Sequence, residues 1–251
     1  MSEEPVIEVE QVDAGYGDTA ILKNVSFSVR KGEVFVILGG SGCGKSTLLK
    51  HMIGLTPPLR GRIRILGDSL FDGSEAERKR AMRHFGVTYQ SGALFGSMTL
   101  LENVCLPLEA FTDLPREARN LVAEMKLDLV GLKDYADYFP SEISGGMKKR
   151  AAIARALALE PPVLFLDEPS AGLDPVTSAE IDRLVLRLRE AQGITFVIVT
   201  HELASIFAVA DRCIMLDKQT RSVLASGRPA DLRDRPPHAA VRAFFNREVN
   251  P

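Results

Sequence analysis

The stretch that decides the fold reads Gly39-Gly40-Ser41-Gly42-Cys43-Gly44-Lys45-Ser46. It fits the pattern G-x-x-x-x-G-K-[ST], a loop whose backbone N–H groups surround the phosphates of a nucleoside triphosphate. Residues 34–38 before it are all apolar and predict a buried strand, and residues 47–53 after it suit a helix. Strand, loop and helix in this order favour a phosphate-binding site over an ordinary glycine-rich turn.

The residue types of the loop have chemical roles that follow from this interpretation. The glycines let the backbone approach oxyanions closely, and the start of the following helix directs partial positive charge at the same place. We expect Lys45 to neutralise the β- and γ-phosphates and Ser46 to bind Mg²⁺. Cys43 also stands at this helix start, which can lower a thiol pKa, so a reactive thiol is one hypothesis and an inert small filler is the other.

Composition limits the classes of protein to which the chain can belong. Its 251 residues suit one large domain, or a domain with a subdomain, and 31 Lys and Arg against 33 Asp and Glu argue against a nucleic-acid partner. Three distant cysteines without a C-x-x-C spacing argue against a metal site or disulfides and suit a reducing compartment. No signal-like start and no apolar run long enough to span a bilayer occur. We therefore expect a soluble chain.

Hydrophobic periodicity predicts an α/β fold. Residues 6–12 and 25–29 alternate apolar and polar side chains, which indicates antiparallel strands near the N-terminus. Residues 99–140 have a helical pattern throughout. Beyond Ser144, helices alternate with short apolar strands, which suits a mainly parallel sheet covered on both faces. These strands are expected at residues 163–166, 195–199 and 212–216.

Several helix boundaries can be predicted from capping and spacing. Ser74 with Glu77, and Thr99 with Glu102, form the capping-box pattern, and a proline in the first turn, Pro115, starts another helix. Helices are also expected at residues 148–160 and, in the C-terminal tail, at 239–247. One helix carries apolar residues at helical spacing, namely Leu121, Met125, Leu129 and Leu132.

Two further motifs carry chemistry. The strand at residues 163–166 leads into Asp167 and Glu168, where Asp167 would hold Mg²⁺ through water and Glu168 would polarise the attacking water. The alternative is a solvated acidic turn. Ser144-Gly145-Gly146-Met147 precedes a helix rich in Lys and Arg and predicts a second anion site, one that completes the nucleotide pocket of a partner subunit. A plain loop is the alternative here.

Together these motifs resemble the nucleotide-binding subunit of an ABC transporter over about residues 6–227. The motifs, in chain order, are 39–46, Gln90, 144–147, 167–168, 170–174 and 200–201. The resemblance implies that residues 1–227 form a single ATPase domain with a P-loop NTPase core, an N-terminal antiparallel β-subdomain and an inserted helical subdomain at about residues 91–147. Residues 228–251 would form a short helical tail.

The same resemblance implies further site residues. Tyr16 would stack on adenine, and Gln90 would sense the γ-phosphate, help to bind Mg²⁺ and contact the membrane partner. His201 would hydrogen-bond the γ-phosphate and orient the water. Asp174 would contact the opposing subunit, although it could also cap the helix that starts at Pro175. Together with Tyr16, the residues expected to bind ATP are Gly39, Gly40, Ser41, Gly42, Cys43, Gly44, Lys45, Ser46, Thr47, Ser144, Gly145, Gly146, Met147 and Asp174.

A finer resemblance rests on Met147, which stands where such signatures usually have Gln, and on residues 90–95, Gln-Ser-Gly-Ala-Leu-Phe. Both are similar to the ATPases of Mla/Mce-type lipid transporters. This resemblance implies an ATP- and Mg²⁺-dependent head-to-tail homodimer at the cytoplasmic face of the inner membrane. Its partners would be an integral membrane permease, a lipid-binding envelope protein and a small regulatory subunit, and no nucleic acid.

Other functions remain open at this point. An ATPase of a small-solute importer, for example for amino acids, shares every motif named so far, because the cargo pocket lies on another chain. A soluble ABC ATPase acting on DNA or ribosomes usually has two cassettes or a long coiled coil, and this sequence has neither. A P-loop kinase would leave the motifs at residues 144–147 and 170–174 unexplained.

Overall fold

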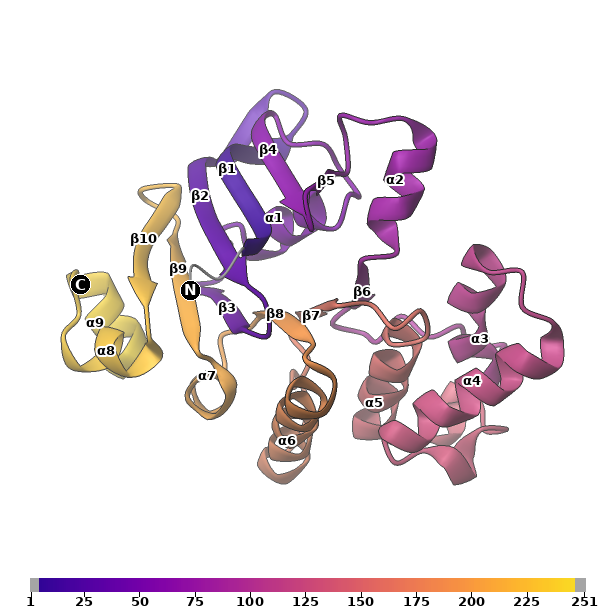
Figure 1. The fold of residues 1–251 in the computed structure, drawn as a ribbon. Helices are drawn as coiled ribbons and strands as arrows, with labels where there is room; N and C mark the ends of the chain where they lie inside the picture. Colours follow the sequence, from indigo (N-terminus) through magenta and orange to yellow (C-terminus); the bar gives the residue numbers. More distant parts are fainter. Residues whose placement is uncertain (1–4, 247–251) are drawn as a thin grey trace.

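A computed structural model describes residues 5–246 and contains two sheets (Figure 1). The first has four strands in the order β2-β1-β4-β5, and the second has six in the order β10-β9-β3-β8-β7-β6. The strands of the first sheet are β1 (Pro5–Tyr16), β2 (Thr19–Arg30), β4 (Arg60–Ile65) and β5 (Asp68–Ser69). Those of the second are β3 (Val34–Gly39), β6 (Phe85–Thr88), β7 (Val163–Asp167), β8 (Thr195–Val199), β9 (Arg212–Asp217) and β10 (Ser222–Gly227).

The six-stranded sheet is parallel except at one edge. Val36 of β3 lies opposite Ile198 of β8 on one side and Cys213 of β9 on the other, and both pairings are parallel. Only β10 runs antiparallel, against β9. Every residue of β3 is buried, as expected for a strand covered on both faces. The predicted α/β class with a mainly parallel sheet and an N-terminal antiparallel sheet is confirmed.

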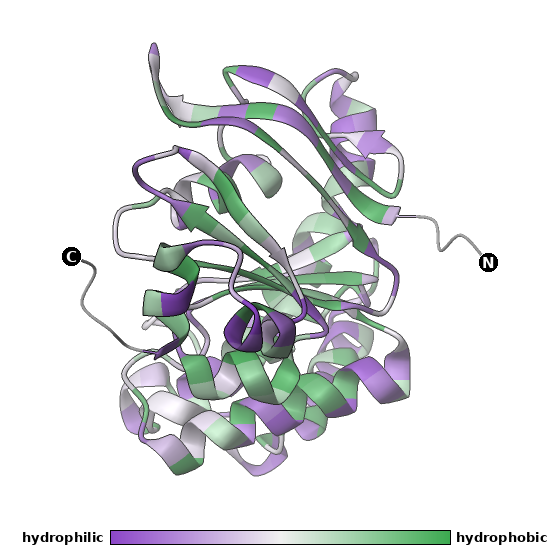
Figure 2. Ribbon diagram, turned by 90° about the vertical axis from the view of Figure 1, so that its left-hand side faces the viewer, coloured by the Kyte–Doolittle hydropathy of each residue, from purple (hydrophilic) through white to green (hydrophobic). Residues whose placement is uncertain are grey.

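Helices cover both faces of the six-stranded sheet (Figure 1). Alternate residues of β3 enter two separate cores: Phe35 and Ile37 pack with α1 and the four-stranded sheet, whereas Val36 and Leu38 pack with α3 to α6. Figure 2 shows hydrophobic residues gathered along the strands and on the helix sides that face them. The helices are α1 (Lys45–Met52), α2 (Glu75–Met82), α3 (Leu100–Phe111), α4 (Arg116–Leu129), α5 (Gly145–Ala156), α6 (Pro175–Gln192), α7 (Leu203–Val209), α8 (Pro229–Asp234) and α9 (Ala239–Asn246), with 3₁₀ turns at Lys133–Tyr135 and Pro140–Glu142.

Both predicted capping boxes are present, at Ser74 for α2 and at Thr99 for α3. Three boundaries differ from the predictions. Pro115 is the N-cap of α4 and lies outside its first turn. The helix expected at 148–160 begins three residues earlier, because Ser144 caps it by accepting the Met147 N–H, and it ends at Ala156. The tail helix α9 is described to Asn246, and the expected end at Arg247 lies outside the described residues.

Most of the apolar residues spaced along α4 lie on its exposed side. Three of the four spaced residues, Leu121, Met125 and Leu129, are exposed, with 61, 58 and 42% of their surface accessible. The buried face of α4 instead contains Ala123, Leu127 and Lys126, whose Nζ donates to Glu160 Oε1 at 2.7 Å. Helical spacing identifies residues that share a face of a helix, but it does not say which face packs inward. Here α3 and α5 pack against the face of α4 opposite to the spaced leucines and methionine.

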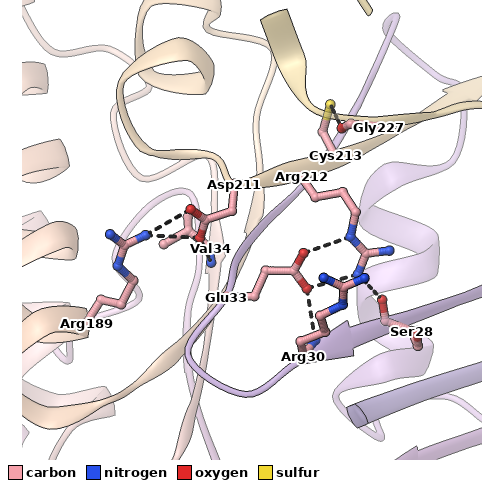
Figure 3. Close-up of polar contacts among 9 residues, drawn as sticks. All are labelled: Ser28, Arg30, Glu33, Val34, Arg189, Asp211, Arg212, Cys213 and Gly227. Carbon is pink, nitrogen blue, oxygen red and sulfur yellow. Dashed lines mark hydrogen bonds and ion pairs between the residues drawn. The ribbon is translucent and has the colours of Figure 1, made fainter. Parts of the chain in front are cut away.

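A polar cluster joins the two sheets (Figure 3). Arg212 of β9 lies 2.7 Å from Glu33 Oε1 and also donates to the Ser28 carbonyl of β2. The neighbouring Asp211 accepts the backbone N–H of Val34 at 2.9 Å. Because Glu33 is buried, its charge depends on Arg212 for compensation, and this ion pair ties the antiparallel sheet to the start of β3.

Candidate active site

The loop between β3 and α1 has a backbone that only glycine can supply at two positions. Gly39 has φ +149°, and an added Cβ would lie 2.4 Å from the Leu216 carbonyl oxygen. Gly44 has φ +103° and is the N-cap of α1, without any side-chain cap. The backbone N–H groups of the first turn of α1 are therefore not taken by a capping side chain, and they suit an anionic ligand.

Lys45 folds back over this loop. Its Nζ donates to the carbonyl oxygens of Gly39 at 2.8 Å and Gly40 at 3.1 Å. These contacts hold the ammonium above the loop, where phosphate oxygens can replace neutral carbonyls as stronger, charged acceptors.

Two carboxylates lie at the carboxyl end of β7. In the sheet, β8 separates β7 from β3, the strand that leads into the phosphate loop. Asp167 is the last residue of β7, and Glu168 follows with φ +46° while donating its N–H to Val199 at 2.8 Å. A positive φ is uncommon for a residue other than glycine, and such strain concentrates at functional sites. His201, which follows β8, places its Nδ1 2.8 Å from Glu168 Oε1.

Buried oxygen atoms at this strand end are left without partners. Asp167 Oδ1, Glu168 Oε2 and Ser170 Oγ are all buried and make no hydrogen bond with the described residues. Buried polar atoms are normally satisfied, so these three fit a site that receives Mg²⁺, water or phosphate. Within residues 5–246 there is no group of three or more His, Cys, Asp or Glu side chains that could hold a metal ion by themselves.

Electrostatics at the strand end agree with this picture. Burial and the adjacent Glu168 raise the pKa of Asp167, while Lys149 and Lys45 act in the opposite direction. A cation next to Asp167 would favour its ionised form. Gln90 and Asp167 line one open cleft, together with Tyr89, Ser91, Ala171 and Gly172.

Lys149 of α5 belongs to the site although the sequence did not single it out. Its Nζ donates to the backbone carbonyls of Gln90 and of Glu168, the latter at 3.1 Å. Burial lowers its pKa, and Asp167 and Glu168 oppose this shift. It therefore holds the Gln90 segment against the carboxylates. The helix rich in Lys and Arg was visible in the sequence, but the partners of one lysine were not.

Tyr16 is the last residue of β1 and has 45% of its surface exposed. Its hydroxyl accepts a hydrogen bond from Lys50 Nζ at 3.1 Å. Two hydrogen bonds lower the pKa of Tyr16: the one with Thr47 has the larger effect and the one with Lys50 the smaller. The tyrosine is thus tied by its hydroxyl to two residues of α1, the helix that follows the phosphate loop.

The motif at residues 144–147 starts α5, which packs on the opposite face of the six-stranded sheet from α1 (Figure 1). Gly146 allows a close approach to α6, because an added Cβ would lie 2.4 Å from Thr177 Cγ2 and would force that side chain to move. Asp174 caps α6 by accepting the N–H groups of Val176 at 3.0 Å and Thr177 at 3.1 Å. The two helices that begin at anion-type motifs thus pack on opposite faces of the six-stranded sheet.

Of the two hypotheses about Cys43, the structure favours the inert filler. Its side chain is 3% exposed, and burial raises the pKa of the thiol, with Lys45 acting in the opposite direction. Its Sγ lies under the loop, 2.7 Å from where a Cβ on Gly39 would be. Desolvation outweighs the helix start here, so a small buried filler is the better description.

A phosphate loop between a buried strand and a helix, with two carboxylates at the end of a nearby parallel strand, defines a P-loop nucleoside triphosphatase. Residues 22–171 match the ABC transporter family, and the chain belongs to this family. As the motifs predicted, it is an ATP-binding and ATP-hydrolysing subunit that uses Mg²⁺.

Individual relatives agree with this assignment. The chain is 41% identical over 247 residues to the probable ribonucleotide transport ATP-binding protein mkl of Mycobacterium leprae, covering 98% of this chain and 70% of the relative. It is 38% identical over 222 residues to the intermembrane phospholipid transport system ATP-binding protein MlaF of Haemophilus influenzae, covering 88% and 83%. A dimeric post-hydrolysis ATP-binding cassette bound to ADP and Pi has a TM-score of 0.79 at 32% identity, covering 88% of this chain and 98% of that chain.

Proposed function

We propose that two copies of this chain bind two ATP molecules between them and power lipid transport through a separate membrane permease. In each site, residues 39–46 of one copy and residues 144–147 of the other enclose the same ATP. The observation that supports this arrangement is that α1 and α5, the helices that begin at the two motifs, pack against opposite faces of one sheet and so stand apart within one copy. One chain presents half of each site, and a head-to-tail pair completes both.

In this proposal each residue of the site has one role. Lys45 and the loop N–H groups hold the β- and γ-phosphates, and Tyr16 stacks on adenine, with Thr47 beside it. Ser46, Asp167 and Gln90 hold Mg²⁺, which when bound offsets the negative charge of the phosphates.

Hydrolysis depends on Glu168, which accepts the proton of the attacking water through its unpartnered Oε2, while His201 holds the other oxygen and faces the γ-phosphate. Ser144, Gly145, Gly146 and Met147 approach the phosphates from the second copy, and Asp174 lies at the contact between copies. Gln90 and the helices α3 and α4 transmit closure to the permease.

The cargo assignment rests on the Met147 and 90–95 patterns and on relatives whose name is that of a phospholipid transport ATPase. A second candidate is a small polar solute, because the relative at 41% identity carries a ribonucleotide transport name. Within residues 5–246 no helix is long and apolar enough to cross a membrane. The chain would act from the cytoplasmic face of the inner membrane, with the permease, a lipid-binding envelope protein and a small regulatory subunit as partners.

The dimer can be tested by sedimentation of the Glu168→Gln variant with and without Mg·ATP. We expect ATP to convert monomer to dimer, and Ser144→Arg in the same background to prevent it. A species that stays monomeric in saturating ATP contradicts the shared site.

For the cargo, the chain co-expressed with its permease is reconstituted in vesicles, and ATP-dependent movement of a labelled phospholipid is compared with that of a ribonucleotide. Movement of the ribonucleotide alone would exclude lipid cargo.

A further inference from the structure

The end of the β1–β2 hairpin is irregular. Tyr16 lies opposite Thr19 and Gly15 opposite Ala20, but the pairing register shifts between Ala14 and Gly15. Such an irregularity leaves a backbone group without a partner in the ladder. The N–H of Gly15 instead donates to Nε2 of His51, at 3.0 Å. A side chain of α1 therefore holds the tip of the hairpin.

His51 is fixed from both sides. It is fully buried, and its Nδ1 lies 2.8 Å from the Thr56 carbonyl oxygen. A carbonyl oxygen only accepts a hydrogen bond and a backbone N–H only donates one. The two contacts therefore select the neutral ring with its hydrogen on Nδ1 and its lone pair on Nε2. Both nitrogen atoms are used, so the imidazole cannot turn without losing a buried hydrogen bond.

The same face of α1 also holds the tyrosine. Thr47, Lys50 and His51 are spaced i, i+3 and i+4, so they lie on one side of the helix. Lys50 Nζ donates to the Tyr16 hydroxyl and lies 5.4 Å from the centre of its ring. Two side chains of α1 thus hold the hairpin tip. His51 binds the backbone of Gly15, and Lys50 binds the side chain of Tyr16.

We propose that His51 is a positioning residue for nucleobase recognition. It holds the Gly15–Tyr16 tip against α1, and so sets the tyrosine ring at a constant separation from the phosphate loop. This inference rests on the proposed stacking of Tyr16 on adenine. It assigns no contact between His51 and the nucleotide, and it predicts an effect on binding of the base that leaves phosphate binding intact.

The test uses three substitutions of His51 in the full chain. His51→Leu keeps much of the bulk but removes both hydrogen bonds. His51→Gln carries an amide oxygen that can reach the Gly15 N–H, and His51→Asn is one methylene too short to do so. Dissociation constants are measured by calorimetry for Mg·ATP and for Mg·tripolyphosphate, a probe with phosphates but no base, and the KM for ATP is measured alongside.

We expect His51→Leu and His51→Asn to weaken ATP binding by about fivefold or more, the lower range for loss of one base–aromatic stack, while tripolyphosphate binding is unchanged. His51→Gln should recover most of the ATP affinity. Equal losses for both probes, or no loss for either, would overturn the proposal. If His51→Leu does not fold, the comparison of the Asn and Gln variants decides, because the acceptor of Gln can reach the Gly15 N–H and that of Asn cannot.

Tyr16→Ala separates this inference from the assignment on which it rests. If Tyr16→Ala reduces the preference for ATP over tripolyphosphate and the His51 variants do not, His51 has no positioning role, although the tyrosine contacts the base. If Tyr16→Ala leaves that preference unchanged, the stacking assignment itself is wrong.

Discussion

Nδ1 of His201 lies 2.8 Å from Oε1 of Glu168, whereas Oε2 of the same carboxylate is buried without a partner among the described residues. The histidine thus orients the carboxylate and leaves one oxygen available. A general base needs this arrangement, because the oxygen that accepts the proton must not already be occupied by a donor.

Replacing Glu168 with Gln tests this role. The amide keeps the shape of the side chain but cannot accept a proton from water, so we expect turnover to fall by roughly 10²–10⁴-fold, the usual contribution of general acid–base catalysis. ATP should remain bound, as measured by calorimetry. Lys45→Ala is the contrasting variant, because it should lose nucleotide binding itself. A Glu168→Gln protein with near-normal phosphate release would remove the residue from this role.

Lys149 should matter for turnover more than for nucleotide affinity. Lys149→Met removes the donor that ties the Gln90 carbonyl to that of Glu168, and we expect a fall in kcat of about tenfold or more from misplaced groups. Steady-state kinetics with ATP titration measure both parameters. Lys126→Met is the matched control, since Lys126 of α4 is also a buried lysine but pairs with Glu160, which lies between α5 and β7. Equal effects of the two substitutions on kcat would show that Lys149 acts through stability alone.

The ion pair between Glu33 and Arg212 should be a major contributor to stability (Figure 3). Arg212→Met leaves a buried carboxylate uncompensated, and we expect the free energy of unfolding to fall by about 3 kcal/mol. Urea unfolding followed by circular dichroism measures this. The double variant Glu33→Met with Arg212→Met should regain part of the loss, because no isolated charge remains. If the double variant is less stable than Arg212→Met, burial of an unpaired charge is not the cause.

Cys43 should resist alkylation in the folded protein. Burial raises its thiol pKa, so at pH 7 to 8 its thiolate fraction is smaller than that of a free cysteine, and labelling by iodoacetamide should increase only at higher pH. Cys213, whose pKa burial raises to about 12, should behave in the same way. Mass spectrometry of folded and urea-unfolded samples gives the comparison. Rapid modification of native Cys43 at pH 7 would restore the reactive-thiol hypothesis.

Local patterns in the sequence were sufficient for the strand–loop–helix unit at residues 34–53, for both capping boxes and for the strand that carries Asp167. In each case the physical cause acts within a few residues: a glycine-only backbone, a side chain that caps its own helix, or a run of apolar residues that can only be buried. Alternation of strand and helix then predicted the parallel sheet. Two neighbouring parallel strands need a connection that returns to the same end of the sheet, and a helix is the usual one.

Tertiary contacts were needed for the rest. The face of α4 that packs inward, the partners of Lys149, the pairing of His51 with Gly15 and the raised pKa of Cys43 could not be predicted from neighbours in the chain. Gln90 and Lys149 are separated by 59 residues, and His51 and Gly15 by 36. Their contacts exist only after the sheets and helices have packed, and burial, which controls the pKa of Cys43 and Lys149, is likewise a property of the packed chain.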